Sequence, residues 1–334
     1  MSSQSFVQRN SWIWAAAGSV VLWVLMGVSS GQFNIESLIA NAYTASFLAI
    51  VSLGQMLVVT TGRGAIDMSI PGVITLGAYI SMSVVGGNNA MLLPGILLLI
   101  AVGAFIGLVN SILVIRLKIP SIIATMAVNY ILVTVSLIIN RGFSEFVICP
   151  VLLGLTRNRI LGIPLVIYLV LLLAAVIHIL ITKTGYGRSL IAMGQNMEAA
   201  RLAGVRIVMV ETLTYIFSAI LAIMTGMLIS ARVGGAFLGM GDSYMMETVA
   251  SIVVGGTLMS GGKANTAGTL AGALFLRLIV TAMQIVGFQV GAQNIAKGVL
   301  IIIVLVAGMG AVSTGSSRRL GKPPGNKRQK GVAA

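Results

Sequence analysis

The sequence predicts an all-α membrane protein with about ten transmembrane helices and both ends of the chain in the cytoplasm. Hydrophobic residues make up 57% of the 334 residues and charged residues only 8%, whereas a soluble domain carries about 25% charged residues. Apolar segments long enough to cross a bilayer recur along the chain. Basic residues gather in alternate connections between these segments, as they do in the cytoplasmic loops of membrane proteins.

Each predicted span is an apolar segment close to the 20 or so residues that a helix needs to cross the hydrocarbon core. The candidate spans are residues 12–30, 45–62, 70–86, 90–115, 119–139, 161–182, 210–231, 247–260, 266–287 and 294–312. The third and eighth are short, and the eighth contains glycine. We expect the eighth to be a partial or re-entrant element, which is stable at membrane depth only where protein or water covers its backbone.

The first span has a competing interpretation as a cleaved signal peptide, because Arg9 precedes its apolar residues. The apolar run is long, however, and it begins with Trp12 and Trp14. Tryptophan is enriched where membrane helices meet the interface. We therefore predict a retained first span, preceded by a cytoplasmic N-terminus over residues 1–11.

The basic residues decide the orientation, because short cytoplasmic loops are enriched in Lys and Arg. With the N-terminus inside, the cytoplasmic connections carry Arg63, Arg116, Lys118, Lys183, Arg188, Arg201, Arg206 and Lys263. The opposite connections carry only Arg141, Arg157, Arg159 and Arg232. The predicted membrane domain therefore covers residues 12–312, with a long cytoplasmic loop over 183–209.

The last segment, residues 313–334, is predicted to be a basic cytoplasmic tail. It contains Lys and Arg but no acidic residue, a composition that attracts the anionic lipids of the cytoplasmic leaflet. Aromatic residues do not alternate with the basic ones, as they do in proteins that stack nucleic-acid bases. We therefore predict contact with the lipid membrane and no nucleic-acid partner.

The sequence carries no pattern typical of an enzyme. Gly261-Gly262-Lys263-Ala264 lacks the upstream glycine and the following Ser or Thr of a phosphate-binding loop. His178 is the one histidine and Cys149 the one cysteine, which is too few for a zinc cluster. We predict no enzymatic activity, no cofactor and no metal site.

Gradient-driven transport requires ionisable groups buried within the spans. By this map every acidic residue lies in a loop or at a span end: Glu36, Asp67, Glu145, Glu198, Glu211, Asp242 and Glu247. Arg277 is the charge nearest the middle of a span, and an arginine does not release its proton at physiological pH. The pattern favours a passive pore or a pathway driven by a separate ATPase.

The loop over 183–209 contains a short predicted helix. Strong helix formers occupy residues 197–203. Asn196 is a suitable N-cap, Glu198 lies where the helix dipole favours an anion, and Gly204 is placed to end the helix. Two turns are marginal in isolation, so we expect the helix to dock into a groove of a partner protein, with the lipid interface as the alternative.

Three blocks resemble the permease subunits of bacterial ABC importers in the ribose, xylose and galactose class. They are Ile66-Asp67-Met68-Ser69, the loop block that ends with residues 198–204, and the glycine-rich region from Ala250 to Ala273. Each block alone is short. Their order and spacing, within a likeness that covers residues 45–310, carry the resemblance.

The resemblance implies a ten-span fold like that of the vitamin B12 importer permease, a type II importer. It implies a second permease copy, identical or different, a separate ATP-binding subunit and a periplasmic substrate-binding protein. The element that couples the permease to the ATPase would comprise Gly194, Asn196, Glu198, Ala199, Ala200, Arg201 and Gly204, with Gly194 supplying the turn into the helix.

Polar residues within the spans are candidates for the solute pathway: Gln55, Asn110, Asn129, Thr134 and Ser218. Each of them is equally suited to hydrogen bonds between helices. Asp67 and Ser69 have two interpretations. They contact the solute, or they cap the third span, with Pro71 in its first turn.

The sequence thus predicts an importer permease for a monosaccharide or related polyol. A branched-chain amino acid or nucleoside permease of the same superfamily is the alternative. A gradient-driven carrier without an ATPase is a third interpretation, from another class of transporter.

Overall fold

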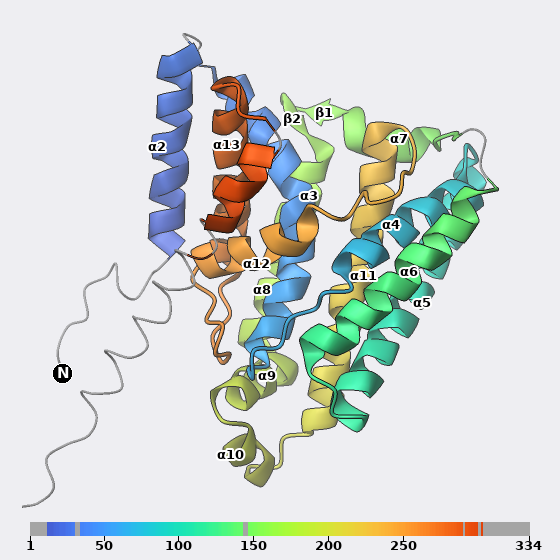
Figure 1. Cartoon of the computed structure of the whole chain (residues 1–334), viewed down its shortest axis with the longest axis vertical. Helices are drawn as coiled ribbons and strands as arrows, with labels where there is room; N and C mark the ends of the chain where they lie inside the picture. Colours follow the sequence, from blue (N-terminus) through green and yellow to red (C-terminus); the bar gives the residue numbers. More distant parts are fainter. Residues whose placement is uncertain (1–11, 31–33, 143–145, 290, 300–301, 303–334) are drawn as a thin grey trace, which may run out of the picture.

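The computed structural model describes residues 12–30, 34–142, 146–289, 291–299 and 302. The predictions for the N-terminal segment 1–11, the tail 313–334 and most of the tenth span lie outside these residues. The described part is almost entirely helical (Figure 1).

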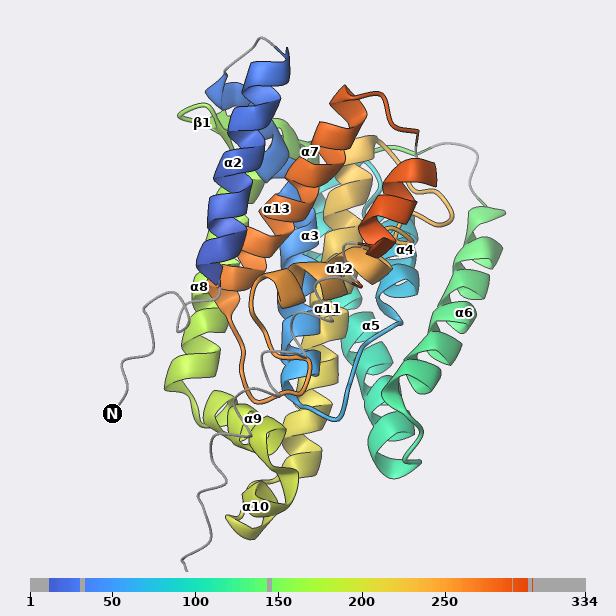
Figure 2. The same ribbon diagram turned by 60° about the vertical axis from the view of Figure 1, so that its left-hand side comes forward.

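Six helical segments are long and apolar enough to cross a membrane, judged by length and composition. They correspond to α3 (Ile35–Thr60), α5 (Leu92–Ser111) with its short flanking helical turns, α6 (Ser121–Asn140), α8 (Leu165–Lys183), α11 (Ile207–Val233) and α13 (Thr266–Ile285). A further helix, α2 (Trp12–Ser30), packs beside α13 (Figures 1 and 2). The sequence predicted all seven of these helices as spans.

The start of α3 differs from the prediction by ten residues, because the helix begins at Ile35 rather than at residue 45. Asn34 caps it, and its side chain accepts a hydrogen bond from the backbone N–H of Glu36 at 2.9 Å. Glu36 adds a carboxylate to the first turn, where the dipole favours it. These local signals extend the helix through a segment that is less apolar than the span itself.

Two apolar helices are short, as predicted. Helix α4 (Ile70–Ile80) continues through a π-helical turn to Val85, and α12 (Tyr244–Val254) has 11 residues. At 1.5 Å per residue, α12 extends about 16 Å, roughly half the thickness of the hydrocarbon core. Figure 1 shows α12 lying across the axes of α3 and α13. It is therefore too short to span a membrane by itself.

The helices differ in how much of their surface is buried by the rest of the protein. The most apolar window of α3 is 83% buried, whereas the corresponding windows of α6 and α8 are 28% buried. Glycine lets α5 approach α11 closely, because a Cβ on Gly107 would lie 2.5 Å from the Cα of Ile216. The core is therefore built around α3 and α11, and the peripheral helices expose apolar side chains.

The two ends of the molecule carry different elements. At one end lie α7 (Pro150–Arg157) and a hairpin of β1 (Arg159–Ile160) and β2 (Ile163–Pro164). At the other lie α9 (Gly185–Gln195) and α10 (Met197–Leu202), together with the connection from α5 to α6 (Figures 1 and 2). The sequence predicted a loop in place of α7, since its apolar residues are too few to form a span.

Candidate functional site

Helix α10 is the short helix predicted in the long loop. Asn196 separates it from α9 in an extended conformation (φ −159°, ψ 105°), and its side chain accepts a hydrogen bond from Ala199 N at 3.0 Å. Gly204 follows the helix with φ +82°, a conformation that suits glycine. Both predicted boundaries are confirmed. Gly194 lies inside α9, so the turn between the helices is made by Asn196 and not by Gly194.

The surface of α10 is unusual for so short a helix. Glu198 and Arg201 form an ion pair at 3.8 Å with side chains 70% and 63% exposed, and Leu202 is 89% exposed. Ala200, by contrast, is buried and anchors the helix. An exposed ion pair contributes at most about 1 kcal/mol to stability. The exposed face of α10 is therefore dispensable for the fold and free for contact with a partner.

Leu202 was not among the candidate residues from the sequence. It follows Arg201 directly and lies shortly before Gly204, which ends the helix. An apolar side chain on so short a helix either packs against the rest of the protein or faces solvent, and the sequence does not distinguish these two arrangements.

A group of closely packed backbones, here called the glycine junction, lies at the C-terminal end of α9. It comprises Thr60, Gly62, Gly194, Gly261 and Gly262. The backbone N–H of Gly262 donates to Thr60 O at 3.0 Å. A Cβ on Gly194 would overlap both Thr60 O and Gly262 N. The junction therefore joins α9 to the end of α3 and to the loop between α12 and α13.

Helix α9 is also fixed to α11. The hydroxyl groups of Tyr186 and Thr214 share a hydrogen bond of 2.8 Å, and the ring of Tyr186 packs edge-on against Phe217, with 5.7 Å between centroids. Burial raises the pKa of the Tyr186 phenol to about 12, so the phenol stays neutral at physiological pH. Helix α9 is thus attached to the membrane helices at two places.

Five of the predicted pathway residues lie together in what is here called the Asp67 cluster: Gln55, Asp67, Ser69, Asn110 and Ser218. One carboxylate oxygen of Asp67 accepts hydrogen bonds from Ser69 N at 3.0 Å and Ser69 Oγ at 2.6 Å. The other accepts from Ser218 Oγ at 2.9 Å. Asn110 Nδ2 donates to Ser69 Oγ at 2.8 Å, and Asp67 N donates to Gln55 Oε1 at 3.2 Å.

The Asp67 cluster connects four helices, because its members come from α3, the start of α4, α5 and α11. Its side chains are buried. Gln55 Nε2 and Asn110 Oδ1 have no hydrogen-bond partner among the described residues, and such unpaired buried groups are uncommon in folded proteins. The cluster therefore has spare donor and acceptor capacity, which a water molecule or a hydroxylated solute can satisfy.

The capping interpretation of this region is confirmed in part. Ser69 is the N-cap of α4 and Pro71 lies in the first turn, but the side chain of Ser69 makes no capping hydrogen bond. Instead, Asp67 accepts from the backbone of Ser69. Asn129 lies on α6, where it accepts from Gly72 N at the start of α4 at 2.7 Å, whereas Thr134 bonds within its own helix.

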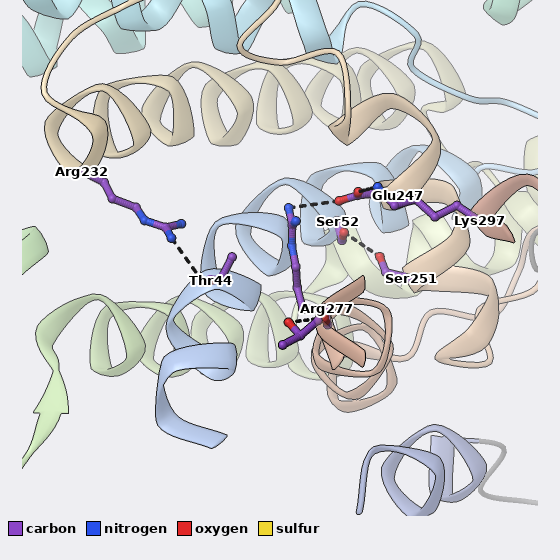
Figure 3. Close-up of polar contacts among 8 residues, drawn as sticks. Thr44, Ser52, Arg232, Glu247, Ser251, Arg277 and Lys297 are labelled. Atoms are coloured by element: carbon purple, nitrogen blue, oxygen red, sulfur yellow. Dashed lines mark hydrogen bonds and ion pairs between the residues drawn. The ribbon is translucent and has the colours of Figure 1, made fainter. Parts of the chain in front are cut away.

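Three acidic residues that the sequence places in a loop or at a span end lie there in the structure, but their side chains are buried. Asp67, Glu211 and Glu247 are all buried, with exposures of 3, 8 and 4%. Glu247 on α12 forms ion pairs with Arg277 at 3.0 Å and Lys297 at 2.8 Å (Figure 3). The two cations offset the desolvation of its carboxylate, a compensation between distant segments that a span-by-span map does not reveal.

We expect Glu247→Gln to destabilise the fold by about 3–5 kcal/mol, because it leaves the largely buried Arg277 and Lys297 without their counter-ion. Thermal unfolding of the purified chain measures this. Glu36→Gln removes an exposed ion pair with Arg159 and should change stability by no more than about 1 kcal/mol. Equal effects of the two substitutions would contradict a structural role for the buried ion pairs.

Arg232, predicted in an outer connection, lies in the last turn of α11 and packs on aromatic rings. Its guanidinium carbon is 4.9 Å from the ring centroid of Tyr43 and 5.1 Å from that of Phe47. It also donates to Thr44 Oγ1 at 3.3 Å (Figure 3). Cation–π contacts of this kind stabilise a charge that is partly removed from water.

The described residues contain no group of three His, Cys, Asp or Glu side chains that could hold a metal ion. Cys149 is buried, and its thiol donates to Asn89 Oδ1 at 2.9 Å.

Comparison with known proteins agrees with this architecture. Residues 37–309 match the family model described as the branched-chain amino acid transport system / permease component. The chain belongs to this family. The permease is accordingly a multi-pass protein of the bacterial inner membrane, with the apolar helices described above as its membrane part.

Relatives of the chain carry the names of permease proteins. It is 30% identical to the probable ABC transporter permease protein YphD of Escherichia coli over 57% of each chain. It is 27% identical to the ribose import permease protein RbsC of Haemophilus influenzae, over 62% of this chain and 65% of the relative. The autoinducer 2 import system permease protein LsrC of Shigella flexneri is 26% identical over 90% of this chain and 87% of the relative.

The match to the first two of these relatives thus covers less than two thirds of their length. No solved structure matches the chain.

Proposed function

We propose that the chain is the membrane-spanning subunit of an ATP-driven importer that moves a monosaccharide or related polyol into the cell. A separate subunit hydrolyses ATP, and a periplasmic binding protein delivers the solute. The names of the ribose-importing relatives support the solute class. The family model supports the role as permease component.

The single observation that best supports transport driven by a separate ATP-binding subunit is the exposed face of α10. Glu198, Arg201 and Leu202 are exposed on a capped helix that Ala200 anchors from its other side. A short amphipathic helix seated in a groove is a common mode of recognition between proteins. We propose that this element, with Gly194, Asn196, Ala199, Ala200 and Gly204, docks on the ATP-binding subunit.

We further propose ten spans, both termini in the cytoplasm and a fold like that of the vitamin B12 importer permease. On this proposal, residues 1–11 and 313–334 flank the membrane domain over 12–312, and α9 and α10 lie at the cytoplasmic end. The permease works as a pair of identical or different copies. The basic residues that sequence analysis placed on the cytoplasmic side support this orientation.

Transport requires two arrangements of the spans of similar free energy, between which ATP binding and hydrolysis switch the permease. The Asp67 cluster is a suitable place for such a switch because it joins four helices through one carboxylate. We propose that Gln55, Asp67, Ser69, Asn110 and Asn129 line or control the solute pathway. The unpaired groups of Gln55 and Asn110 support contact with hydroxyl groups.

We expect Asp67→Ala to lower ATP-driven uptake at least about tenfold, because it removes a buried carboxylate that accepts three hydrogen bonds. The complex with the ATPase should still form, since the partners of Asp67 are Ser69 and Ser218 rather than α10. Uptake in proteoliposomes and pull-down of the ATPase measure the two properties. Asp242→Ala alters an exposed acid in a loop and should change neither. Loss of the complex in Asp67→Ala would show that Asp67 is structural.

The proposed function is tested by co-purification with the cognate ATPase and binding protein, followed by ATP hydrolysis in the presence of different solutes. Stimulation by a monosaccharide or polyol supports the proposal. Stimulation by leucine alone would favour the branched-chain amino acid class named in the family description. Uptake that needs no ATPase would favour a gradient-driven carrier.

A further inference from the structure

A cavity of about 530 Å³ lies between α10, the start of α11 and two connections, those from α3 to α4 and from α5 to α6. The transport role proposed above uses Arg201 of its lining for docking but assigns no function to the cavity itself. Its charged lining residues are Arg63, Lys118, Arg201 and Glu211. Three cations therefore face one carboxylate, in a concave site large enough for a small anion.

The backbone at two of these cations is strained. Arg63 has φ +59° and Lys118 has φ +55°, the left-handed region in which a Cβ is crowded. Within the described part of the chain, Leu161 is the one other non-glycine residue with positive φ. Backbone strain of this kind clusters at ligand sites, where the surrounding structure maintains it. Two separate loops thus place a cation on the same cavity at a conformational cost.

Helix ends add to the positive potential. The cavity is lined by Ser121, the first residue of α6, and by Ile207 and Val208, the first two of α11. Neither helix has a side-chain capping bond or an acidic residue in its first turn. The positive end of the helix dipole favours anions at both places.

We propose that this cavity binds a phosphate-bearing anion, carried by a small cytoplasmic solute or by the headgroup of an anionic lipid. Arg63 and Lys118 contact the phosphate, with Arg201 contributing from α10. Glu211 is 8% exposed. Its carboxylate repels the bound anion and lowers the affinity of the cavity for it. Since Arg201 belongs to α10 and the other groups to the membrane helices and their connections, the bound anion bridges the two.

A bound anion that bridges α10 and the membrane helices is expected to regulate transport. This expectation rests on the proposed function. An anion in the cavity restrains α10 relative to α11 and to the connections that carry Arg63 and Lys118. The permease then responds less readily to the ATPase. Binding itself does not require that the proposed function be right, so the two statements can be tested separately.

Binding is tested with the purified full chain in phosphatidylcholine nanodiscs, titrated calorimetrically with inorganic pyrophosphate at low ionic strength, where charge interactions are least screened. We expect Arg63→Gln and Lys118→Gln each to weaken binding at least about tenfold, since each removes a charge-assisted contact, and Glu211→Gln to tighten it. Arg116→Gln, an exposed cation beside the same connection that does not line the cavity, should bind as the unaltered chain does.

The substitutions are expected to change the affinity in opposite directions. This distinguishes an effect on binding from misfolding, because a misfolded Glu211→Gln chain would not bind more tightly. Nanodiscs that contain phosphatidylglycerol distinguish the sources of phosphate. Competition by the lipid identifies the headgroup, and undiminished binding identifies the soluble anion. The proposal is overturned if pyrophosphate does not bind, if Arg116→Gln weakens binding as much as Arg63→Gln, or if Glu211→Gln weakens it.

Regulation is tested in proteoliposomes that contain the ATPase, with pyrophosphate on the ATPase side. We expect slower uptake by the unaltered permease and little change in Lys118→Gln. Equal inhibition of both would overturn the regulatory statement. If neither chain supports ATP-driven uptake, the proposed function fails while the calorimetric result stands.

Discussion

Glu198→Arg is expected to reduce solute-stimulated ATP hydrolysis to the basal rate, a loss of at least about tenfold, because like charges at an interface oppose association. The substitution reverses a charge on the exposed face of α10 and places it three residues from Arg201. A docking partner then meets two cations where it met an ion pair. The measurement is ATP hydrolysis by the reconstituted complex with and without solute.

The fold should tolerate this change, because the ion pair that it removes is exposed and contributes little to stability. Glu36→Arg is the matched control. It reverses a charge in an exposed ion pair of the same kind, with Arg159 at 3.4 Å. Arg159 belongs to β1, which lies at the opposite end of the molecule from α10 (Figure 1). If Glu198→Arg couples normally, or if Glu36→Arg uncouples to the same extent, the docking assignment of α10 is wrong.

Gly194→Ala is expected to impair both stability and transport, by about 1–3 kcal/mol in stability as for an overpacked core. Alanine favours a helix over glycine by about 1 kcal/mol, so α9 by itself would gain. The added Cβ, however, overlaps Thr60 O and Gly262 N, and backbone atoms cannot move aside as side chains do. Thermal unfolding and ATP-driven uptake measure the two effects.

Gly185→Ala provides the control within the same helix. A Cβ at Gly185 meets nothing within 4 Å, so the substitution should leave transport unchanged and stability unchanged or slightly higher. Similar behaviour of the two alanine variants would contradict the proposed importance of the glycine junction.

The glycine junction offers a physical route from α10 to the membrane helices. A displacement of α9 moves atoms that contact the end of α3 and the loop that leads from α12 to α13. Packed backbone segments do not deform continuously, so such a displacement is expected to shift whole elements. Backbone contacts transmit the motion without the conformational freedom of long side chains.

Most of the fold could be predicted from the sequence, because membrane spans are recognised by their length and composition. The local signals of α10 were equally clear, since Asn196 and Gly204 act on their own helix and need no tertiary context. The start of α3 was misplaced because its first residues are held by a cap rather than by apolarity.

What depends on contacts between distant segments was harder to predict. The sequence placed Glu247 at a span end, where the structure has it, but did not predict its counter-charges. Arg277 and Lys297 lie 30 and 50 residues away and meet it in the interior. The resemblance implied that Gly194 supplies a turn, whereas its close contacts with Thr60 and Gly262 cannot be read from the sequence. The Asp67 cluster was named residue by residue, but its assembly around one carboxylate required the structure.

The most direct test of the account is uptake of a radiolabelled monosaccharide into proteoliposomes that contain the permease and its binding protein, with and without the ATP-binding subunit. We predict uptake only when that subunit and ATP are both present, and its loss in Glu198→Arg. Uptake at the full rate without the ATP-binding subunit would contradict the claim that the permease is driven through α10.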